Sequence, residues 1–147
     1  MTTITRCTSP GQPGWLALRT ALWPEEEEEH LAEMRAFCAQ PERYAQFLAC
    51  SADNAPQGFV EIALRSDYVN GTASSPVAFL EGLYVAPAFR RQGIAALLVE
   101  KAQEWAREHG CSELASDAVL ENTASHALHR ALGFTETERV VYFRKLL

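Results

Sequence analysis

The hexapeptide Arg90-Arg91-Gln92-Gly93-Ile94-Ala95 has the residue types of a loop that binds a diphosphate. It follows an apolar segment typical of a strand and opens an amphipathic segment typical of a helix. Amide hydrogens in the first turn of a helix lack intrahelical acceptors and point outward with the positive end of the helix dipole, so they can bind an anion. Glycine lets the backbone approach the ligand, and arginines can add charge-assisted hydrogen bonds. Taken alone, the pattern also fits a plain strand-to-helix turn with solvated arginines.

Glu81 is a carboxylate inside an otherwise apolar run, residues 77–83. A buried carboxylate is costly unless it has a partner, so Glu81 either lies at an opening or pairs with a cation. Residues 25–29 are five consecutive glutamates that could attract a polycation. Acidic residues also favour the first turn of a helix, so a solvated helix start is the simpler interpretation of that run.

Hydrophobic periodicity and turn residues predict the elements that must position these groups. We expect helices at residues 15–23, 25–40, 93–108 and 122–132, and strands at residues 3–7, 44–50, 58–65, 77–85, 112–116 and 134–144. Gly82 is expected to mark a bulge in its strand. This order predicts an α+β fold in which a mixed sheet carries helices on its faces, with residues 1–147 forming one domain.

Composition limits the classes of protein that this chain can belong to. There is no signal-peptide pattern and no apolar run approaching the roughly 18 residues of a membrane span, so we expect a soluble cytoplasmic protein. The net charge of −6, without a basic stripe, argues against a nucleic-acid partner and is compatible with a cationic substrate. Four scattered cysteines predict reduced thiols with neither disulfides nor a metal site: Cys7, Cys38, Cys50 and Cys111.

The residues around the hexapeptide add a family resemblance. Leu83-Tyr84-Val85-Ala86-Pro87 precedes it, and Asn122 and Leu132-Gly133-Phe134 follow it. With these flanks, residues 3–144 resemble the GNAT acetyltransferase superfamily, which implies the GNAT acyl-CoA N-acyltransferase fold, a central, mostly antiparallel sheet flanked by helices. The resemblance also implies cofactor-binding residues. The pyrophosphate of acetyl-CoA would lie on Arg90, Arg91, Gln92, Gly93, Ile94 and Ala95, and its pantetheine arm along Leu83, Tyr84 and Val85 and against Asn122. A simple helix cap is the alternative role of Asn122.

Several segments resemble one family within that superfamily, the aminoglycoside 6'-N-acetyltransferases. They are spread over the chain and include loops: Leu22-Trp23-Pro24, Asp67-Tyr68-Val69-Asn70-Gly71, Ser75-Pro76-Val77, Phe79-Leu80-Glu81-Gly82, Ala115-Ser116-Asp117 and Glu136-Thr137-Glu138-Arg139-Val140. The resemblance implies transfer of acetyl to the 6'-amine of a cationic aminoglycoside such as tobramycin or kanamycin, and a homodimer. It places five side chains in the substrate site: Trp23, Tyr68, Glu81, Asp117 and Glu138. From their types alone, Trp23 could equally be a core residue, Asp117 a turn cap and Glu138 a surface residue.

The chemistry that fits these residues is direct attack of the amine on the thioester in a ternary complex. Glu81 is our candidate for the general base, and Asp117 would orient the amine or share that role. Where many members of the superfamily have a tyrosine acid, four residues before the Gly-Phe pair, this chain has His129, so the protonation of the thiolate is open. Tyr142 is a second candidate, with packing as its alternative role, and Cys111 fits a buried thiol rather than a nucleophile.

Two other functions are compatible with the sequence. A GNAT enzyme could acetylate a different amine, such as a polyamine, a metabolite or a protein N-terminus. A non-catalytic acyl-CoA-binding module would keep the fold without turnover, although Glu81 and Asp117 argue against it. No metal is required by any of these functions.

Overall fold

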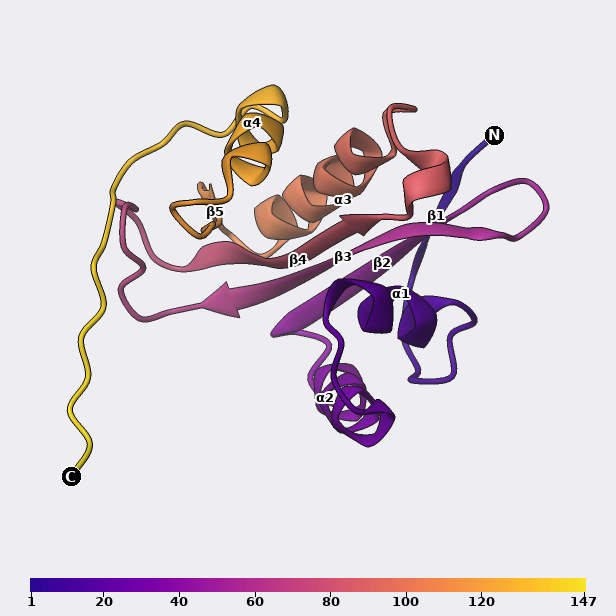
Figure 1. Cartoon of the computed structure of the whole chain (residues 1–147), viewed down its shortest axis with the longest axis horizontal. Helices are drawn as coiled ribbons and strands as arrows, with labels where there is room; N and C mark the ends of the chain where they lie inside the picture. Colours follow the sequence, from indigo (N-terminus) through magenta and orange to yellow (C-terminus); the bar gives the residue numbers. More distant parts are fainter.

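The computed structural model describes residues 1–147 and is built on a five-stranded sheet with the order β1-β2-β3-β4-β5 (Figure 1). The strands are β1 (Thr3–Arg6), β2 (Tyr44–Cys50), β3 (Pro56–Arg65), β4 (Val77–Val85) and β5 (Leu114–Ala115). The first four strands pair antiparallel, and β5 pairs parallel with β4. The expected mixed, mostly antiparallel sheet is confirmed.

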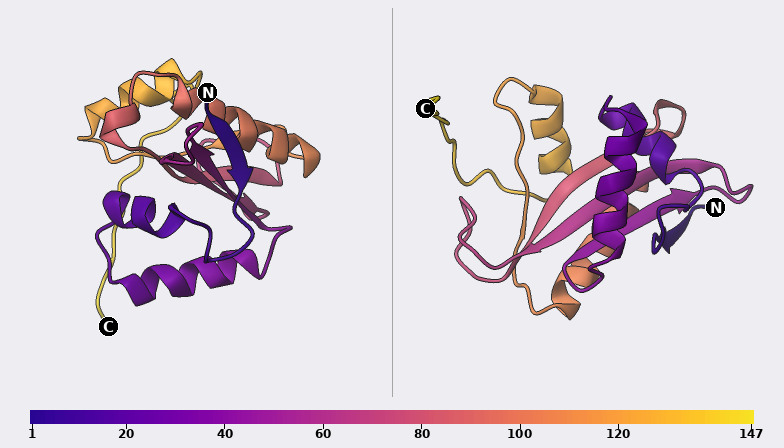
Figure 2. Two further views of the ribbon diagram at one scale, coloured as in Figure 1. Left: turned by 90° about the vertical axis from the view of Figure 1, so that its right-hand side faces the viewer. Right: turned by 90° about the horizontal axis from the view of Figure 1, so that it is seen from below.

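Helices cover both faces of this sheet. α1 (Trp15–Leu22) and α2 (Glu27–Cys38) lie on one face, and α3 (Ile94–Glu108) and α4 (Thr123–Ala131) lie on the other (Figures 1 and 2). A short 3-10 helix, η1 (Pro87–Phe89), connects β4 to the loop before α3. None of the helices combines the length and the apolar character that crossing a membrane would require.

The two larger hydrophobic clusters hold the layers together, one on each face. Because successive strand residues point to opposite faces, Leu48 and Phe59 pack toward α1 and α2, whereas their neighbours Phe47 and Val60 pack toward α3. Leu98 on α3 is fully buried in the second cluster. The sheet is therefore buried on both faces along its centre, which fixes the register of the strands that carry the site.

The strand prediction for residues 134–144 is wrong in this structure. After α4 the chain runs on with no strand or bridge to Leu147, and residues 135–147 are all exposed. The composition of the segment suits a strand, but a strand also needs a neighbour for its backbone hydrogen bonds, and none lies beside it here. The strand predicted at residues 112–116 shortens to β5, which pairs with β4 only at Ala78–Leu114 and Phe79–Ala115.

All four cysteines are free thiols, as the sequence predicts. Burial, helped by the charge of Glu61, raises the pKa of Cys7 to about 12. Relative to a thiol with the ordinary pKa of 9.0, this lowers the thiolate fraction near neutral pH about 1,000-fold.

We therefore expect Cys7 to resist iodoacetamide in the folded protein, while the half-buried Cys38 reacts first. Peptide mass spectrometry after timed alkylation measures this order. The urea-unfolded chain is the control, and all four thiols should react in it. Equal labelling of Cys7 and Cys38 in the folded protein would contradict the burial of Cys7.

Candidate functional site

Glu81 is the extra residue of a bulge in β4. Glu61 lies opposite Gly82 and Ile62 lies opposite Leu80, so Glu81 has no counterpart on β3. The bulge expected at Gly82 is thus confirmed, and it turns the Glu81 side chain toward the α1–α2 face of the sheet. The ring of Trp23 lies directly against Gly82, where any Cβ atom would collide with it. Trp23 and Glu81 therefore meet at the bulge.

The Glu81 carboxylate has a cationic partner that the sequence did not reveal. Arg65, from the end of β3, donates a hydrogen bond through Nη2 to Oε1 of Glu81 at 2.7 Å. Its guanidinium also lies 3.8 Å from the centre of the Phe79 ring. The Glu81 side chain keeps 35% of its surface exposed, so this ion pair is open to exchange with another cation.

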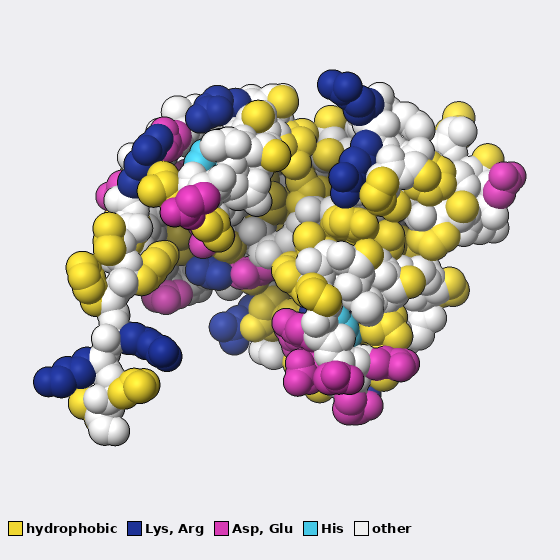
Figure 3. Space-filling view, viewed as in Figure 1, with side chains coloured by type: hydrophobic (Ala, Val, Ile, Leu, Met, Phe, Trp, Pro, Cys, Tyr) yellow, Lys and Arg dark blue, Asp and Glu magenta, His cyan; other side chains and the backbone are white.

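A cleft of about 330 Å³ opens beside Glu81 between the sheet and helices α1 and α2. Four of its lining residues are glutamates and one is an arginine: Glu25, Glu33, Glu61, Glu81 and Arg19, with Trp23, Phe37 and Tyr44 as aromatic walls. Acidic side chains also gather on the surface over α2 (Figure 3). The cleft has the charge and the aromatic faces that suit a cationic, hydroxyl-bearing ligand.

A buried ion pair forms the floor of this cleft. Arg19 Nη1 lies 2.5 Å from each carboxylate oxygen of Glu61, and Trp15 Nε1 donates to Oε2 of Glu61 at 2.9 Å. Only 1% of Arg19 and 3% of Glu61 is exposed. The Arg19 guanidinium lies 5.0 Å from the Trp23 ring centre, so the floor also supports the aromatic wall.

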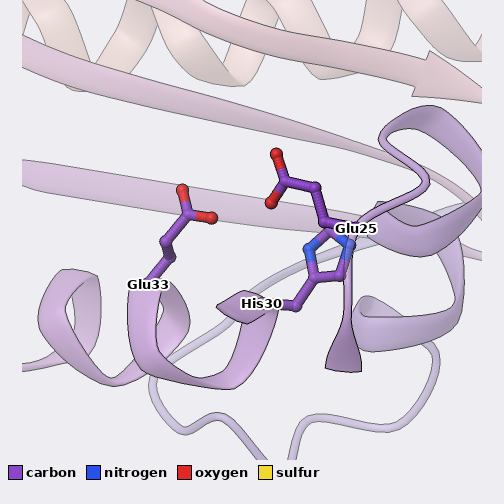
Figure 4. Close-up of side chains that lie close together, drawn as sticks. All are labelled: Glu25, His30 and Glu33. Carbon is purple, nitrogen blue, oxygen red and sulfur yellow. The ribbon is translucent and has the colours of Figure 1, made fainter. Parts of the chain in front are cut away.

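His30 ties the start of α2 to this floor. Arg19 Nε can only donate, so Nδ1 of His30 accepts its hydrogen bond at 3.1 Å, and Nε2 donates to the Trp23 carbonyl at 2.8 Å. Figure 4 shows His30 close to Glu25 and Glu33, a grouping close enough for three metal ligands. Both imidazole nitrogens are already engaged, so His30 offers no free lone pair to a metal. Through its hydrogen bond to the Trp23 carbonyl, His30 stabilises the position of Trp23.

The loop from Arg90 to Ala95 has the geometry of an anion-binding nest. Arg91 and Gly93 both have positive φ, 64° and 78°. The amides of residues 91–93 have no acceptor in the chain, and α3 begins at Ile94 without a side-chain cap. Open space surrounds Gly93, so its glycine is required by backbone conformation rather than by a close neighbour. Consecutive unpaired amides at a helix start fit the predicted diphosphate site.

Arg90 makes contacts within the protein that connect this loop to β4. Its Nε donates to the Val85 carbonyl at 2.8 Å, and its guanidinium lies 5.6 Å from the Tyr84 ring centre. Arg90 thus fixes the end of β4 relative to the loop, while the exposed side chains of Arg91 and Gln92 remain free to contact a ligand.

β4 offers an unpaired backbone edge between the bulge and this loop. β5 pairs with β4 only as far as Phe79, so Leu83, Tyr84 and Val85 have β3 on one side and no strand on the other. An extended ligand with amide groups can add to such an edge like a strand. The edge leads from the anion-binding loop toward Glu81, along the residues where the family resemblance places a pantetheine arm.

The remaining predicted residues lie in two further places. The Asn122 side chain accepts a hydrogen bond from the Ser125 amide at 3.1 Å. The structure therefore confirms that Asn122 caps α4, the alternative role considered for it. His129 on α4 contacts Ser116 at the end of β5, with 2.7 Å between Nε2 and Oγ. Sequence reasoning missed Ser116, although it directly precedes Asp117. Asp117 is exposed and makes no ion pair in this structure.

Tyr68 and Glu138 are not joined to Glu81 by any hydrogen bond or ion pair. Tyr68 is 72% exposed on the loop between β3 and β4. Glu138 lies past α4, where the chain passes close to Gly71 of that same loop. The segments that carry Tyr68 and Glu138 therefore lie close together, but neither residue lines the cleft.

The chain is similar to known acetyltransferases. A sequence model of the acetyltransferase (GNAT) family matches residues 15–134. An aminoglycoside N(6')-acetyltransferase type 1 of Serratia marcescens is 57% identical over 145 residues, which cover 98% of this chain and 99% of that protein. A protein of the same name from Acinetobacter baumannii is 53% identical over 131 residues, 89% of each chain.

Solved structures agree with this similarity. The crystal structure of the aminoglycoside 6'-N-acetyltransferase AAC(6')-Ih from Acinetobacter baumannii has a TM-score of 0.95 at 49% identity and covers 100% of this chain and 99% of its own. The structure of AAC(6')-Iy in complex with the bisubstrate analogue CoA-S-monomethyl-acetylneamine has a TM-score of 0.93 at 42% identity, with coverage of 100% and 99%. Both alignments include the exposed segment after α4.

Proposed function

The chain belongs to the acetyltransferase (GNAT) family, and we propose that it transfers the acetyl group of acetyl-CoA to the 6'-amine of aminoglycoside antibiotics of the tobramycin and kanamycin type. Such a transfer would make the host resistant to these drugs. The observation that carries the proposal is the acidic cleft beside Glu81, which opens where the unpaired edge of β4 ends. Relatives at 53–57% identity bear the same activity in their names.

Acetyl-CoA is the co-substrate, and the chain's own groups explain how it would be held. The unpaired amides before α3, with Arg91 and Gln92, would bind the pyrophosphate. The free edge at Leu83, Tyr84 and Val85 would pair with the pantetheine amides. Together these contacts would bring the thioester to the bulge. Asn122, at the start of α4, would add a contact to the pantetheine beside its capping role.

The reaction would join both substrates directly. The 6'-ammonium first loses a proton to Glu81, directly or through a water, and the freed nitrogen attacks the thioester carbonyl carbon. A backbone amide near Leu83 would stabilise the developing oxyanion. After the attack the nitrogen gives up a second proton to solvent. The C–S bond then breaks, releasing the neutral amide product and the coenzyme A thiolate, which takes up one proton. Asp117 would orient the amine.

His129 is our candidate for the group that supplies this proton. Its Nε2 lies 2.7 Å from the Ser116 hydroxyl, and its Nδ1 lies 2.7 Å from the Ser125 carbonyl. The Ser125 carbonyl can only accept a hydrogen bond, so Nδ1 donates to it, and Nε2 carries a proton only in the imidazolium form. From that form, the hydroxyl of Ser116, which directly follows β5, could pass a proton to the sulfur. Trp23, Tyr68 and Glu138 would complete the substrate site together with Glu81 and Asp117.

We expect Arg65→Gln to lower KM for tobramycin about two- to five-fold, because the guanidinium must leave Glu81 before a substrate ammonium can replace it. That factor corresponds to the small free energy of a half-exposed ion pair. Steady-state kinetics measures the change. Lys101→Gln is the matched control, since it breaks a similarly exposed ion pair on α3 and should leave KM unaltered. A higher KM in Arg65→Gln would show that Arg65 assists binding instead.

The same proposal extends to the whole molecule. We propose that residues 1–147 act as one domain, that two copies form a homodimer, and that the protein acts in the cytoplasm. The four free thiols support a reducing compartment, where acetyl-CoA is also available. The two hydrophobic clusters pack on opposite faces of one sheet, which supports a single folding unit.

A polyamine is the second candidate substrate, because the exposed carboxylates of Glu25, Glu33 and Glu81 line one cleft and would also attract a linear polycation. Following coenzyme A release with a panel of aminoglycosides and polyamines separates the two. Mass spectrometry of the product from tobramycin and acetyl-CoA, with the acetylated nitrogen located, then tests the position of transfer. If coenzyme A were released with polyamines but with no aminoglycoside, the aminoglycoside proposal would be overturned. If acetyl-CoA bound but no amine released coenzyme A, the protein would be a non-catalytic module.

A further inference from the structure

A second cavity, of about 310 Å³, lies next to the acidic cleft, and the proposed function does not use it. Phe37 and Tyr44 line both cavities, and the centres of their rings lie 5.0 Å apart. The volume falls at the lower end of the ~300–1,000 Å³ that pockets for small molecules occupy. The rest of the lining comes from the end of β1, the end of α2 and the start of β2, and it includes Arg6, Cys38, Pro41 and Gln46.

Gln46 is a buried polar side chain of this cavity that has no hydrogen-bond partner. Only 3% of the residue is exposed, and its side-chain amide bonds to no group of the chain. Glu61, its neighbour on β3, is instead bonded by Arg19 and Trp15. A buried amide without partners is costly, since it has two donors and an acceptor to satisfy. Because this amide borders the open volume of the cavity, a ligand there would supply the missing partners.

Arg6 gives the cavity its positive charge. Its Nη2 donates to the carbonyl oxygens of Pro41 at 2.7 Å and of Tyr44 at 3.2 Å. These two bonds hold the guanidinium in place, and they leave the N–H groups of Nε and Nη1 without an acceptor in the chain. No carboxylate lines this cavity, whereas four glutamates line the cleft beside it. The second cavity therefore favours an anion where the cleft favours a cation.

From the unpaired amide and the held guanidinium we infer that this cavity binds a small monocarboxylate with an apolar body. One carboxylate oxygen would accept a hydrogen bond from Arg6 and the other from the amide of Gln46. The apolar body would pack on Phe37 and Tyr44. One guanidinium balances one negative charge, so a monocarboxylate suits the lining better than a phosphate dianion. The inference is independent of the proposed function, because it concerns binding in a different cavity.

A chemical-shift titration of the full-length protein with benzoate tests the site. We expect saturable binding with a dissociation constant of about 1 mM or tighter. Arg6→Gln and Gln46→Leu should each raise this constant at least about ten-fold, because each removes a hydrogen bond to a charged group. Arg91→Gln is the matched control, since it removes an arginine of the anion-binding loop and should change the constant less than about two-fold. Benzamide, the uncharged analogue, should bind at least about ten-fold more weakly.

The alkylation of Cys38 locates the bound benzoate. Cys38 lines the cavity, whereas Cys50 is likewise half-buried but is not part of the lining. Saturating benzoate should therefore slow the reaction of Cys38 with iodoacetamide at least about five-fold and leave the rate of Cys50 unchanged. Peptide mass spectrometry after timed alkylation measures both rates. Binding that leaves Cys38 as reactive as before would place benzoate elsewhere and contradict the inference.

Thermal unfolding separates loss of the site from loss of the fold. Gln46→Leu removes an amide that has no partner, so its Tm without ligand should be no lower than that of the wild type. A lower Tm would mean that the amide serves the fold, and Gln46 could not then be assigned to a ligand. The absence of saturable binding, equal affinity for benzamide, or an equal effect of Arg91→Gln and Arg6→Gln would also refute the site. Tobramycin acetylation is measured separately, so its absence would contradict only the proposed function.

Discussion

The Glu81→Gln variant is expected to acetylate tobramycin at least about 100-fold more slowly than the wild type, with little change in acetyl-CoA affinity. The amide has the size of the carboxylate and can still accept the hydrogen bond of Arg65, so the bulge of β4 should keep its shape. It cannot take a proton from the substrate ammonium. The loss should therefore appear in kcat rather than in the binding of coenzyme A.

Glu104→Gln is the matched control for this experiment. Glu104 pairs with Lys101 on α3 and is 47% exposed, so it resembles Glu81 in its ion pair and exposure but lies outside the site. Steady-state rates of coenzyme A release and calorimetric titration with acetyl-CoA measure both quantities. Near-normal turnover in Glu81→Gln would remove Glu81 from the role of base and make Asp117 the next carboxylate to substitute.

The parts of the site that depend on local sequence could be predicted. A glycine with positive φ directly before an amphipathic segment is a local pattern, and the loop ending at Gly93 has that conformation. The bulge was predictable for a similar reason, because a glycine and a carboxylate interrupt an apolar strand at Glu81 and Gly82. Both features follow from residues adjacent in the chain, where residue type constrains backbone conformation most directly.

The parts that depend on distant partners could not be predicted. Arg19 and Glu61 are 42 residues apart and meet only because α1 packs on β3. Arg65 and Glu81, 16 residues apart, meet only because β3 and β4 pair antiparallel. The residues after Phe134 show the opposite error. Their β-branched and aromatic side chains predict a strand, but pairing is a property of two segments, and no second strand lies beside these residues.

The buried ion pair under the cleft should dominate the stability of the α1–α2 face. Arg19→Met leaves the Glu61 carboxylate buried without its cation, which should lower the free energy of unfolding by about 3–5 kcal/mol. The substitution also removes the hydrogen bond to His30 and the guanidinium beside Trp23. We therefore expect KM for tobramycin to rise in this variant even under conditions in which the variant remains folded.

A double-mutant cycle separates pairing from burial. Arg19→Met/Glu61→Leu removes both charges, so no uncompensated charge stays buried. Its free energy of unfolding, measured by urea denaturation, should therefore fall less than that of either single variant. Arg35→Met, which breaks the exposed pair with Glu28, should cost less than about 1 kcal/mol and serves as the control. If Arg19→Met were no less stable than Arg35→Met, the Glu61 carboxylate could not depend on Arg19. Trp23 would then be held against the bulge by packing alone, and the double variant should retain the wild-type KM.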